Sequence, residues 1–576
     1  MKGYEINLYP ASINTVNGVK WVYINNKGEI ILKVRYDSAL DFQSNALAII
    51  GIKDTYGIID VKGKYIVEPK YGSINQFSEG RAVAIDEKGF SIIGEDGRVV
   101  TQKSYSFIGN YTEGRALFSS SNKKGKSLYG YLDINGTELI PAIYEMAGDF
   151  KKGKAVVKIK ENEFALIGTN GERLNTYYFA YVGELGDGLL AFQKKASGKF
   201  GYIDEKGSIV ISERYSMAGA FSNGRSIVNM SDSFINQIGL INRKGDFVIA
   251  PRHNDIKLLG ENRVAVGKAI DNKRPYMGSK YSVADINGFF FIDFIYNDIS
   301  EYVNGLASTY NNYYTFFIDI IGRGVKRLPI IDGSGTIEIR GTLVKAYVDQ
   351  RISYFDQSGN LVWKQNSVIP LNKNYRVKEE RFRPNMDYLV YYPQLQGITK
   401  EIAAKTVNNK LKLLSKIKEI NENAQLDYNY TGNFSIEFFK KNLLVLQLNG
   451  YEYHFGAAHG MPSKVFPCIN IVNGRFFELK DLFKENSNYI KILSDIVGKQ
   501  IRTDSEYSYI FPNSYIGIKE NQPFYVKEDA LFLYFFPYEI APYAAGFPTF
   551  KIPYSDILNI IDRKGEFWRS YNYITP

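Results

Sequence analysis

The chain has 576 residues, more than one hydrophobic core usually organises, so we expect two or more cooperative units. Hydrophobic residues make up 45% and charged residues 23%, a balance that excludes a largely disordered chain. The net charge of +10 is spread evenly, with 26 basic and 22 acidic residues in 366–576 against 45 and 39 before them. Because no basic run marks a phosphate-binding face, we expect no nucleic-acid partner; anionic glycans and acidic proteins remain open as partners.

The sequence also bears on the compartment. Its first residues contain no uninterrupted apolar core such as a signal peptide needs, and no later run approaches the roughly 20 apolar residues of a membrane span. We therefore expect a cytoplasmic protein, with a secreted or cell-surface protein as the alternative if a leader has been removed. Cys468 is the only cysteine, so no intrachain disulfide forms, and its apolar neighbours predict a small buried hydrophobe.

One pattern recurs about ten times in residues 1–365, at intervals near 35 residues. Each unit has a glycine, preceded three residues earlier by Asp, Asn or Gly, which are typical of tight turns. Seven residues before the glycine, each of the first six units has an aromatic residue. The pattern predicts a strand that an aromatic opens and a hairpin turn closes. The glycines are Gly28, Gly63, Gly97, Gly136, Gly171, Gly207, Gly245, Gly288, Gly322 and Gly359, spaced by 35, 34, 39, 35, 36, 38, 43, 34 and 37 residues.

The rest of each unit predicts further strands. A second strand, often followed by proline and tyrosine, leads into a loop with a phrase such as Phe77-Ser78-Glu79-Gly80, and a short apolar strand then returns to the next unit. We expect an all-β array of three to four short strands per unit, either an open β-superhelix or propeller-like. The last three units depart from the pattern and are expected to cap the array or to join the next domain.

The unit resembles the WG repeat of bacterial proteins, named for a Trp-Gly or aromatic-Gly pair that opens a strand. Tyr56-Gly57, Tyr129-Gly130 and Phe200-Gly201 have this pair. The resemblance spans residues 18–365 and implies a repeat scaffold without one particular ligand. The aspartates that precede the turn glycines could form a metal-binding column, but turn chemistry accounts for them, so we expect no metal and no cofactor.

A second domain is expected over residues 366–576, because glycine falls from 41 in the first 365 residues to 10 in the last 211. Ile402, Val407, Leu411, Leu414 and Ile417 recur at helical spacing, and a second helix is expected over 488–501. Strands are expected at 435–439 and 443–453. Asn473-Gly474 predicts a type I′ hairpin between 468–472 and 475–479. The domain is therefore predicted to be α+β.

Several phrases in this domain resemble one found in lysozyme-sensing anti-sigma-factor ectodomains and beside the catalytic domain of some peptidoglycan deacetylases. They are GAAHG at 456–460, LKDLF at 479–483 and YEIAPYAAG at 538–546. The resemblance covers about residues 370–560. It implies an extracytoplasmic domain that senses or binds at the cell envelope.

Candidate functional residues are few, since the chain has only three histidines and histidine is the usual base near neutral pH. His253 stands where other units have tyrosine, which predicts packing, and His454 has no partners that would complete a zinc site. His459, Tyr538, Glu539 and Tyr543 are predicted to form a polar ligand-binding site. We expect a non-enzymatic interaction protein that binds a protein or cell-wall-derived ligand; the alternative is a glycan hydrolase using His459 and Glu539.

Overall fold

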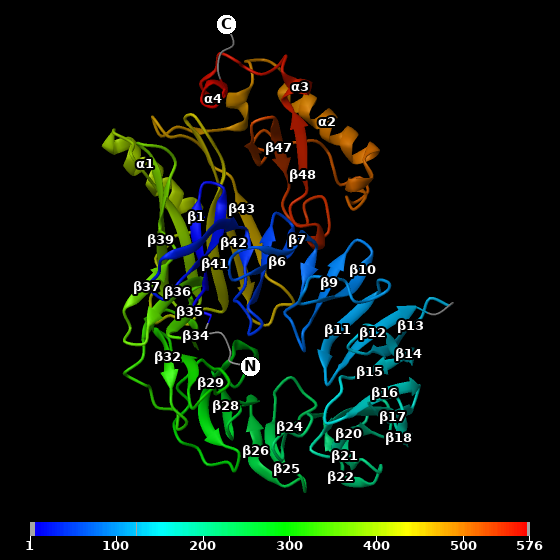
Figure 1. Ribbon diagram of the computed structural model, residues 1–576. Coiled ribbons are helices and arrows are strands. Elements are labelled where there is room, and N and C mark those ends of the chain that lie inside the picture. The colour runs from blue at the N-terminus through cyan, green and yellow to red at the C-terminus, as the bar shows by residue number, and fades with distance from the viewer. Residues whose placement is uncertain (1–5, 122–123, 573–576) are drawn as a thin grey trace. The chain divides into compact units, whose positions relative to one another are not determined.

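The structure, a computed structural model, describes residues 6–121 and 124–572 (Figure 1). Residues 1–5, which entered the expectation about a leader, lie outside the described part. The chain divides into two compact units. Residues 1–12 and 20–365 form the first, here called the repeat domain, and residues 13–19 and 366–576 form the second, the C-terminal domain. Segment 13–19 groups with the second unit, where the Asn14 N–H donates to Asn366 Oδ1 at 2.7 Å.

Ten small antiparallel sheets form the repeat domain in the described part of the chain, each with three or four strands in chain order, as predicted. The first five contain β1 (Tyr9–Thr15), β2 (Gly18–Ile24) and β3 (Ile30–Tyr36); β4 (Ser38–Ala39), β5 (Leu47–Ile52), β6 (Thr55–Asp60) and β7 (Tyr65–Tyr71); β8 (Ser73–Ile74), β9 (Arg81–Asp86) and β10 (Gly89–Gly94); β11 (Phe107–Thr112), β12 (Arg115–Ser121), β13 (Ser127–Leu132) and β14 (Glu138–Tyr144); and β15 (Met146–Ala147), β16 (Lys154–Lys160), β17 (Glu163–Gly168) and β18 (Arg173–Tyr177).

The other five sheets follow in the same way. They contain β19 (Tyr181–Gly186), β20 (Leu189–Gln193), β21 (Phe200–Asp204) and β22 (Ile209–Tyr215); β23 (Met217–Ala218), β24 (Arg225–Asn229), β25 (Ile238–Asn242) and β26 (Phe247–His253); β27 (Asp255–Leu258), β28 (Arg263–Ala269) and β29 (Ser279–Asp285); β30 (Asp298–Ile299), β31 (Ala307–Tyr310), β32 (Tyr314–Ile318) and β33 (Ile331–Asp332); and β34 (Gly335–Arg340), β35 (Leu343–Val348), β36 (Arg351–Asp356) and β37 (Leu361–Lys364).

The predicted hairpin turn is present in all ten units, with every turn glycine at a φ between 74° and 91°. In the second unit the Asp60 carboxylate accepts the N–H groups of Lys62 and Lys64, both at 2.9 Å. In the two units that have glycine at that position, carboxylates farther along the turn, Asp96 and Glu172, accept backbone N–H groups instead. Acidic or amide side chains therefore complete the turns, which accounts for their recurrence in the sequence.

Each turn glycine packs against the preceding unit. A β-carbon on Gly97 would lie 2.5 Å from the carbonyl oxygen of Ile66, and one on Gly288 would lie 2.4 Å from that of Val248. Gly28, in the first unit, makes the same contact with the last unit: a β-carbon there would lie 2.4 Å from the carbonyl oxygen of Val362. Because the relation between neighbouring units also joins the first unit to the tenth, the array is a closed ring.

Further contacts join the two ends of the ring. The Tyr354 hydroxyl donates to the Pro10 carbonyl at 2.8 Å, and the rings of Tyr9 and Tyr354 have centroids 5.6 Å apart. Lys345 Nζ lies 2.5 Å from Asp41 Oδ2. Figure 1 shows the sheets following one another around the ring, from blue through cyan to green. The propeller-like form of the prediction is confirmed, and the open superhelix is wrong.

The loop phrase that includes Glu79 and Gly80 also joins neighbouring units. Glu79 Oε2 accepts the N–H of Gly114 at 2.7 Å, and Arg81 Nε donates to the Ile134 carbonyl at 2.9 Å. Equivalent bonds recur along the ring: the carboxylates of Glu113, Asp187 and Glu261 accept the N–H groups of Gly153, Gly224 and Gly305, and Arg115, Arg225 and Arg263 donate to the carbonyls of Thr169, Ile286 and Ile320. This phrase therefore supplies polar links between sheets, in addition to ending a loop.

The ring closure predicts that Gly28→Ala lowers the melting temperature more than Gly114→Ala does. Both glycines have a left-handed φ, +81° and +75°, so each alanine carries a backbone penalty of about 1 kcal/mol. Only the Gly28 variant also forces Val362 to move, which adds roughly 1–3 kcal/mol, because space around Gly114 is open within 4 Å. Thermal unfolding of the two variants checks this, and equal shifts would show that the contact between first and last units does not form.

The C-terminal domain is α+β, as predicted. Its large sheet contains β38 (Val368–Pro370), β39 (Arg376–Asn385), β40 (Tyr388–Gln396), β41 (Tyr428–Lys440), β42 (Leu443–His454), β43 (Met461–Val465), β44 (Cys468–Asn470) and β45 (Phe476–Phe477), and its small sheet contains β46 (Phe524–Val526), β47 (Ala530–Tyr534) and β48 (Thr549–Pro553). The α-helices are α1 (Glu401–Leu414), α2 (Tyr489–Thr503), α3 (Tyr554–Ile557) and α4 (Glu566–Arg569). Short 3-10 helices are η2 (Leu479–Leu482), η3 (Ser505–Tyr507) and η4 (Tyr543–Ala545), with η1 (Pro275–Met277) in the repeat domain.

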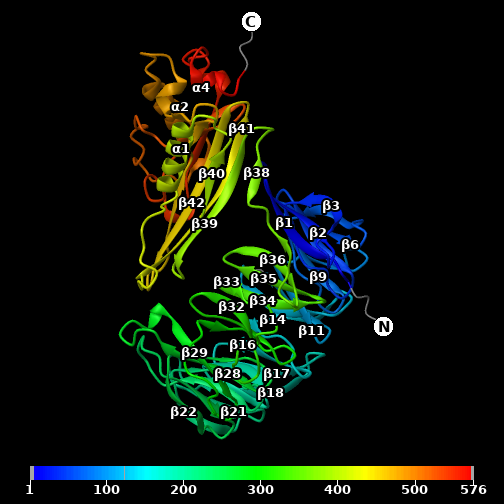
Figure 2. The same cartoon turned by 90° about the vertical axis from the view of Figure 1, so that its left-hand side faces the viewer.

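Two helices cover the sheets of this domain. Figure 2 shows α1 lying over the large sheet, and Val407 and Leu411 on α1 are fully buried there. The second helix, α2, buries Leu493 and Val497 against the small sheet, as its spacing predicts. The helix predicted from the spacing of Ile402 to Ile417 is wrong at both ends of its buried face. Ile402 is 85% exposed, and Lys416 takes a left-handed φ of 60°, so Ile417 lies beyond the end of α1.

The strand pair expected before the hairpin is confirmed as β41 and β42, and both strands are longer than predicted. The type I′ hairpin at Asn473-Gly474 is wrong. Cys468 pairs with Phe477 and Ile469 with Phe476, so the loop is longer than two residues. The Asn470 carbonyl instead accepts the Gly474 N–H at 2.8 Å, and the Asn470 side-chain oxygen accepts the Val472 N–H at 3.0 Å, so the turn begins at Asn470.

Candidate functional site

The site residues predicted in the C-terminal domain come from two loops. His459 lies between β42 and β43, whereas Tyr538, Glu539 and Tyr543 follow β47. Three of the four side chains come together. The ring of His459 stacks on that of Tyr543, with centroids 4.0 Å apart, and its Nε2 lies 3.2 Å from the Tyr538 hydroxyl oxygen.

The glycine after His459 fixes this loop. The Gly460 N–H donates to the Tyr451 hydroxyl at 2.9 Å, and the Tyr543 hydroxyl donates to the Gly460 carbonyl at 2.8 Å. A β-carbon on Gly460 would lie 2.6 Å from the Glu452 carbonyl oxygen, so only glycine fits. The backbone beside His459 is therefore held from β42 and from the second loop before any ligand binds.

The hydrogen bonds of His459 decide what its ring can do. Its Nδ1 lies 3.1 Å from the Gly460 carbonyl oxygen, which only accepts, so Nδ1 carries the proton. In the neutral ring Nε2 is then an acceptor, and the Tyr538 hydroxyl donates to it. Both ring nitrogens are occupied, an arrangement that orients the ring and suits a binding surface more than a free general base.

Glu539, the fourth predicted residue, points its carboxylate to other partners. Its Oε1 lies 2.6 Å from Lys519 Nζ, and its Oε2 accepts the Phe536 N–H at 3.0 Å. The carboxylate thus closes the turn that carries Tyr538, whose φ of 67° is left-handed. Glu539 positions the aromatic residues and is not paired with His459.

We call the surface formed by His459, Tyr451, Tyr538 and Tyr543 the His459 face. Tyr538 is 52% exposed and Tyr451 39% exposed, while nearby Phe536 and Met461 are also exposed large side chains. Exposed aromatic and methionine side chains are enriched where proteins bind partners, and tyrosine adds a hydroxyl that can hydrogen-bond. The surface can therefore stack on a flat or ring-shaped ligand and bond its polar groups.

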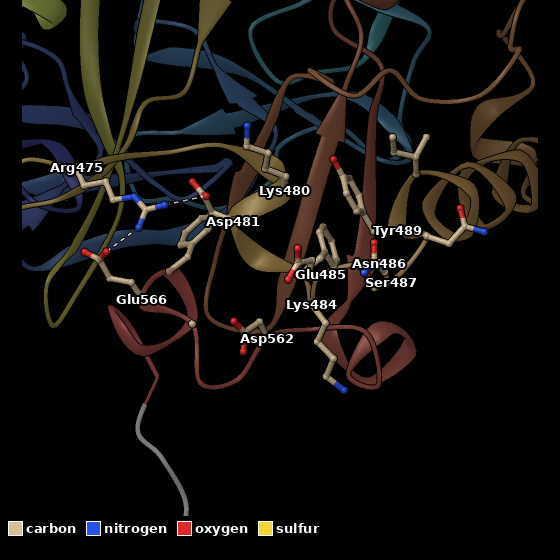
Figure 3. A pocket seen from close by; sticks show the side chains of 15 residues that line it. Arg475, Lys480, Asp481, Lys484, Glu485, Asn486, Ser487, Tyr489, Asp562 and Glu566 are labelled. Carbon is tan, nitrogen blue, oxygen red and sulfur yellow. Dashed lines mark hydrogen bonds and ion pairs between the residues drawn. The ribbon is translucent and has the colours of Figure 1, made fainter.

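A cavity of about 550 Å³ lies at the N-terminal end of α2 in the same domain (Figure 3). In Figure 3, Arg475 bridges two carboxylates: its Nη2 lies 2.9 Å from Asp481 and its Nη1 2.8 Å from Glu566. Lys480, on the cavity wall, is paired with Glu478 at 2.8 Å. Because these charges are already matched, the Arg475 cluster joins η2 to α4 and serves the fold.

The other residues that the sequence raised have structural roles. Cys468 is buried, and burial raises the pKa of its thiol to about 12, so it stays protonated as the predicted small hydrophobe. His253 is buried among Phe290 and Phe294, as packing predicts. His454 is exposed and bonds Glu452 at 3.1 Å. Across the described residues, no three His, Cys, Asp or Glu side chains gather as a metal site.

Comparison with known proteins defines the repeat domain. Residues 21–55, 56–85, 129–162 and 200–232 match the family model described as a WG containing repeat. Four segments of the ring therefore match the WG repeat. A β-carbon on Gly57, the glycine of the WG pair, would lie 2.5 Å from the Val67 carbonyl oxygen, which explains the glycine that follows the aromatic.

In the C-terminal domain, residues 480–555 match a family described as a protein of unknown function, DUF3298. This segment includes Tyr538, Glu539 and Tyr543, and His459 lies before it. Over 184 residues the chain is 24% identical to the peptidoglycan-N-acetylmuramic acid deacetylase PdaC of Bacillus subtilis, a match that covers 30% of this chain and 39% of that protein. The chain thus spans about two fifths of the length of this curated relative.

Solved structures show similar partial matches. A DUF3298 family member from Bacteroides fragilis is 20% identical, over 32% of this chain and 92% of the other, with a TM-score of 0.25. A second, from Pseudomonas aeruginosa, is 17% identical over 34% and 95%, also with a TM-score of 0.25. A eukaryotic initiation factor matches 62% of this chain and 95% of the other at 9% identity and a TM-score of 0.38. The WG repeats and the DUF3298 segment indicate an interaction or scaffold role. No helix in the described ranges is long and apolar enough to cross a membrane.

Sequence reasoning missed two residues of the site, Tyr451 and Lys519. Tyr451 lies on β42, where its neighbours Tyr453 and His454 made it one of several aromatic residues without a distinguishing spacing. Lys519 lies 20 positions before Glu539 in a stretch without regular structure, so no periodicity links the two. Only the fold shows that one fixes the His459 loop and the other holds the Glu539 carboxylate.

The Arg475 cluster predicts a pH-dependent stability. Burial alone would raise the pKa of Glu566, but hydrogen bonds from Asn473, Arg475 and Asn470 outweigh it and hold the pKa below its ordinary value. A lowered pKa means that the ionised group stabilises the fold above about pH 4.3 and that this stabilisation is lost as the pH falls. Glu566→Gln should therefore lower the melting temperature at pH 7, with a difference from wild type that shrinks towards pH 3.

Thermal unfolding between pH 3 and pH 7 measures this effect. Glu485→Gln is the matched control, since Glu485 is an exposed carboxylate on the wall of the same cavity. The control should change the melting temperature little at any pH. A Glu566→Gln difference that stayed constant with pH would contradict the assignment.

Proposed function

We propose that the protein is a non-enzymatic binding protein, in which the closed ring is a scaffold and the C-terminal domain binds a cell-wall-derived glycan on the His459 face. The observation that carries this proposal is the stack of the exposed His459 and Tyr538 with the half-buried Tyr543, held in place by hydrogen bonds that do not need a ligand. A preformed surface loses little conformational entropy on binding, which favours affinity.

The class of ligand follows from the chemistry of this face. Sugar rings have apolar C–H faces that pack on aromatic rings, and hydroxyls that bond to the polar edges of tyrosine and histidine. The name of the matched relative, a deacetylase of peptidoglycan, supports a cell-wall glycan, although the match covers 39% of that protein. If the partner is a protein, the chain should stay unbound to purified peptidoglycan in the test below.

The competing function is a glycan hydrolase using His459 and Glu539. Such an enzyme needs an acid and a base placed on the scissile bond. Here Nε2 of His459 accepts from Tyr538, while Glu539 is paired with Lys519 and the Phe536 N–H. These bonds favour binding over catalysis.

The proposal predicts that the full chain is retained on purified peptidoglycan and that Tyr538→Ala and Tyr543→Ala each weaken retention about tenfold. An aromatic contact contributes about 1 to 1.5 kcal/mol, which corresponds to a factor of roughly ten in affinity. The measurement is a sedimentation binding curve of each variant with insoluble peptidoglycan. Tyr509→Ala is the matched control, because Tyr509 is a similarly exposed tyrosine, 37%, in the same domain.

Three outcomes count against the proposal. Wild-type protein that stays in the supernatant at all peptidoglycan concentrations excludes the glycan. Equal loss of retention in the Tyr509→Ala control shows that the His459 face is not the binding surface. Release of reducing sugars by wild type, abolished in His459→Ala, establishes the hydrolase instead.

A further inference from the structure

Three units of the ring have a turn-glycine spacing above 37 residues: the unit that ends at Gly136, with 39, and two neighbouring units that are extended at the same point. The turn glycines Gly207 and Gly245 are 38 residues apart, and Gly245 and Gly288 are 43 apart, whereas most spacings lie between 34 and 37. The extra residues lie between β24 and β25, at 230–237, and between β28 and β29, at 270–278. Both segments therefore extend the same hairpin of two consecutive sheets. In repeat proteins such insertions often gather on the binding face.

The two extended hairpins are joined through Asn254, which follows β26. Its side chain donates to the Pro275 carbonyl at 3.1 Å and to Ser279 Oγ at 2.8 Å, and its own carbonyl accepts the side-chain N–H of Asn236 at 3.1 Å. Asn236 belongs to the first insertion and Pro275 to the second. The insertions are thus fixed relative to each other and to the strand that ends in His253.

A cavity of about 580 Å³ lies between them, within the usual size range of small-molecule sites. Its wall combines apolar residues, amides and two cations. It is lined by Ile235, Asn236, Arg252, His253, Asn254, Lys268, Ala269, Asn272, Pro275, Phe290 and Phe294.

His253 is the third departure from the repeat at this place. In seven other units, the residue that pairs with the strand-opening position is tyrosine, as where Tyr56 pairs with Tyr71; here Ile238 pairs with His253. The smaller imidazole is buried, and it is stacked on Phe294 at a centroid distance of 6.2 Å and an angle of 22°. The substitution replaces a phenol by a shorter ring at the cavity wall.

The imidazole also brings hydrogen-bonding capacity to an apolar surface. Burial and the neighbouring Arg252 both lower the pKa of His253, so the ring is neutral near pH 7, with one donor and one acceptor nitrogen. Among the described residues, none makes a hydrogen bond with either ring nitrogen. The wall at His253 can therefore both stack on a ligand and bond it.

The charge of the cavity has one sign. Arg252 and Lys268 are exposed on its wall, and none of the described residues that line it is acidic. Of the acidic residues nearest in sequence, Asp232 is paired with Lys199, Asp255 accepts from the Tyr281 hydroxyl and Asp271 is paired with Arg274. Asp293, next to Phe294, is exposed and is not part of the lining. Two cations above an aromatic wall attract an anion.

We propose that this cavity is a binding site for a small anionic ligand with a flat aromatic ring, the ring lying against His253, Phe290 and Phe294 and the anionic group bound by Arg252 and Lys268. A phosphate and a carboxylate would bind the same two cations. The structure therefore specifies a negatively charged group and an aromatic ring, and the experiment below decides between phosphate and carboxylate. The site lies in the repeat domain and does not depend on the function proposed for the His459 face.

Isothermal titration of the full chain with adenosine 5′-monophosphate, benzoate and uncharged adenosine tests the proposal. We expect binding of at least one anion, with the phosphate and carboxylate arms showing which group is preferred, and at least tenfold weaker binding of adenosine than of its monophosphate. Arg252→Gln should weaken anion binding at least tenfold. Arg35→Gln is the matched control, because Arg35 precedes Tyr36 in the first unit as Arg252 precedes His253.

The decisive variant is His253→Tyr, which restores the residue that the other units use and should leave the fold intact. It should fill part of the cavity and abolish anion binding, with an unchanged melting temperature and unchanged retention on peptidoglycan. Failure of both anions to bind at millimolar concentration would overturn the proposal, as would binding that His253→Tyr leaves unchanged or that Arg35→Gln weakens as much as Arg252→Gln. A loss of peptidoglycan retention without loss of anion binding would concern the His459 face alone.

Discussion

The repeat domain depends on one close contact, in which the turn glycine of each unit packs against the unit before it. At Gly28, Gly97 and Gly288 the space that a side chain would need is occupied by a backbone carbonyl of the neighbour. Since carbonyl positions are fixed by the backbone, the contact at these three glycines sets the spacing between sheets more tightly than the side-chain contacts at Gly63, Gly171 and Gly207. The polar links made by Glu79 and Arg81 reach from one unit to the next only because that spacing is constant.

Much of this arrangement could be predicted from the sequence, because it is local. The turn at Asp60 to Gly63 needs a carboxylate and a left-handed residue at fixed positions, and both are visible as a recurring pair. Closure could not be predicted, since Gly28 carries the same local signal whether its neighbour is the tenth unit or solvent. Whether a ring closes depends on a small angle added at every sheet, which no single residue encodes. The two-residue turn predicted at Asn473-Gly474 failed because Asn470 accepts the N–H groups of Val472 and Gly474, which makes the turn begin earlier in the chain.

The sequence predicted which residues form most of the candidate site, but it did not predict how they bond to one another. The runs around His459 and Tyr538 pointed to the right loops, and the fold brings His459, Tyr538 and Tyr543 within contact. The sequence does not show that Glu539 is held by Lys519, because hydrogen-bond partners far apart in an irregular stretch leave no periodic signal. That one bond changes the chemistry of the site, since it removes the carboxylate from the histidine and leaves an aromatic surface.

The two domains lead to functional residues by different physical routes. The C-terminal domain has no repeated units to compare with one another. A site there has to be recognised from the exposure and fixed geometry of its side chains, as at Tyr538. In the ring, nine other units show what packing alone requires, so a departure from them needs a cause of its own. The loop that connects β24 to β25 takes no part in the glycine contacts that set the spacing of the sheets. It can therefore lengthen without disturbing the closure of the ring. His253 and the two extended hairpins occur together where this freedom exists, which is why the irregular units of a regular ring are the places where binding can be added.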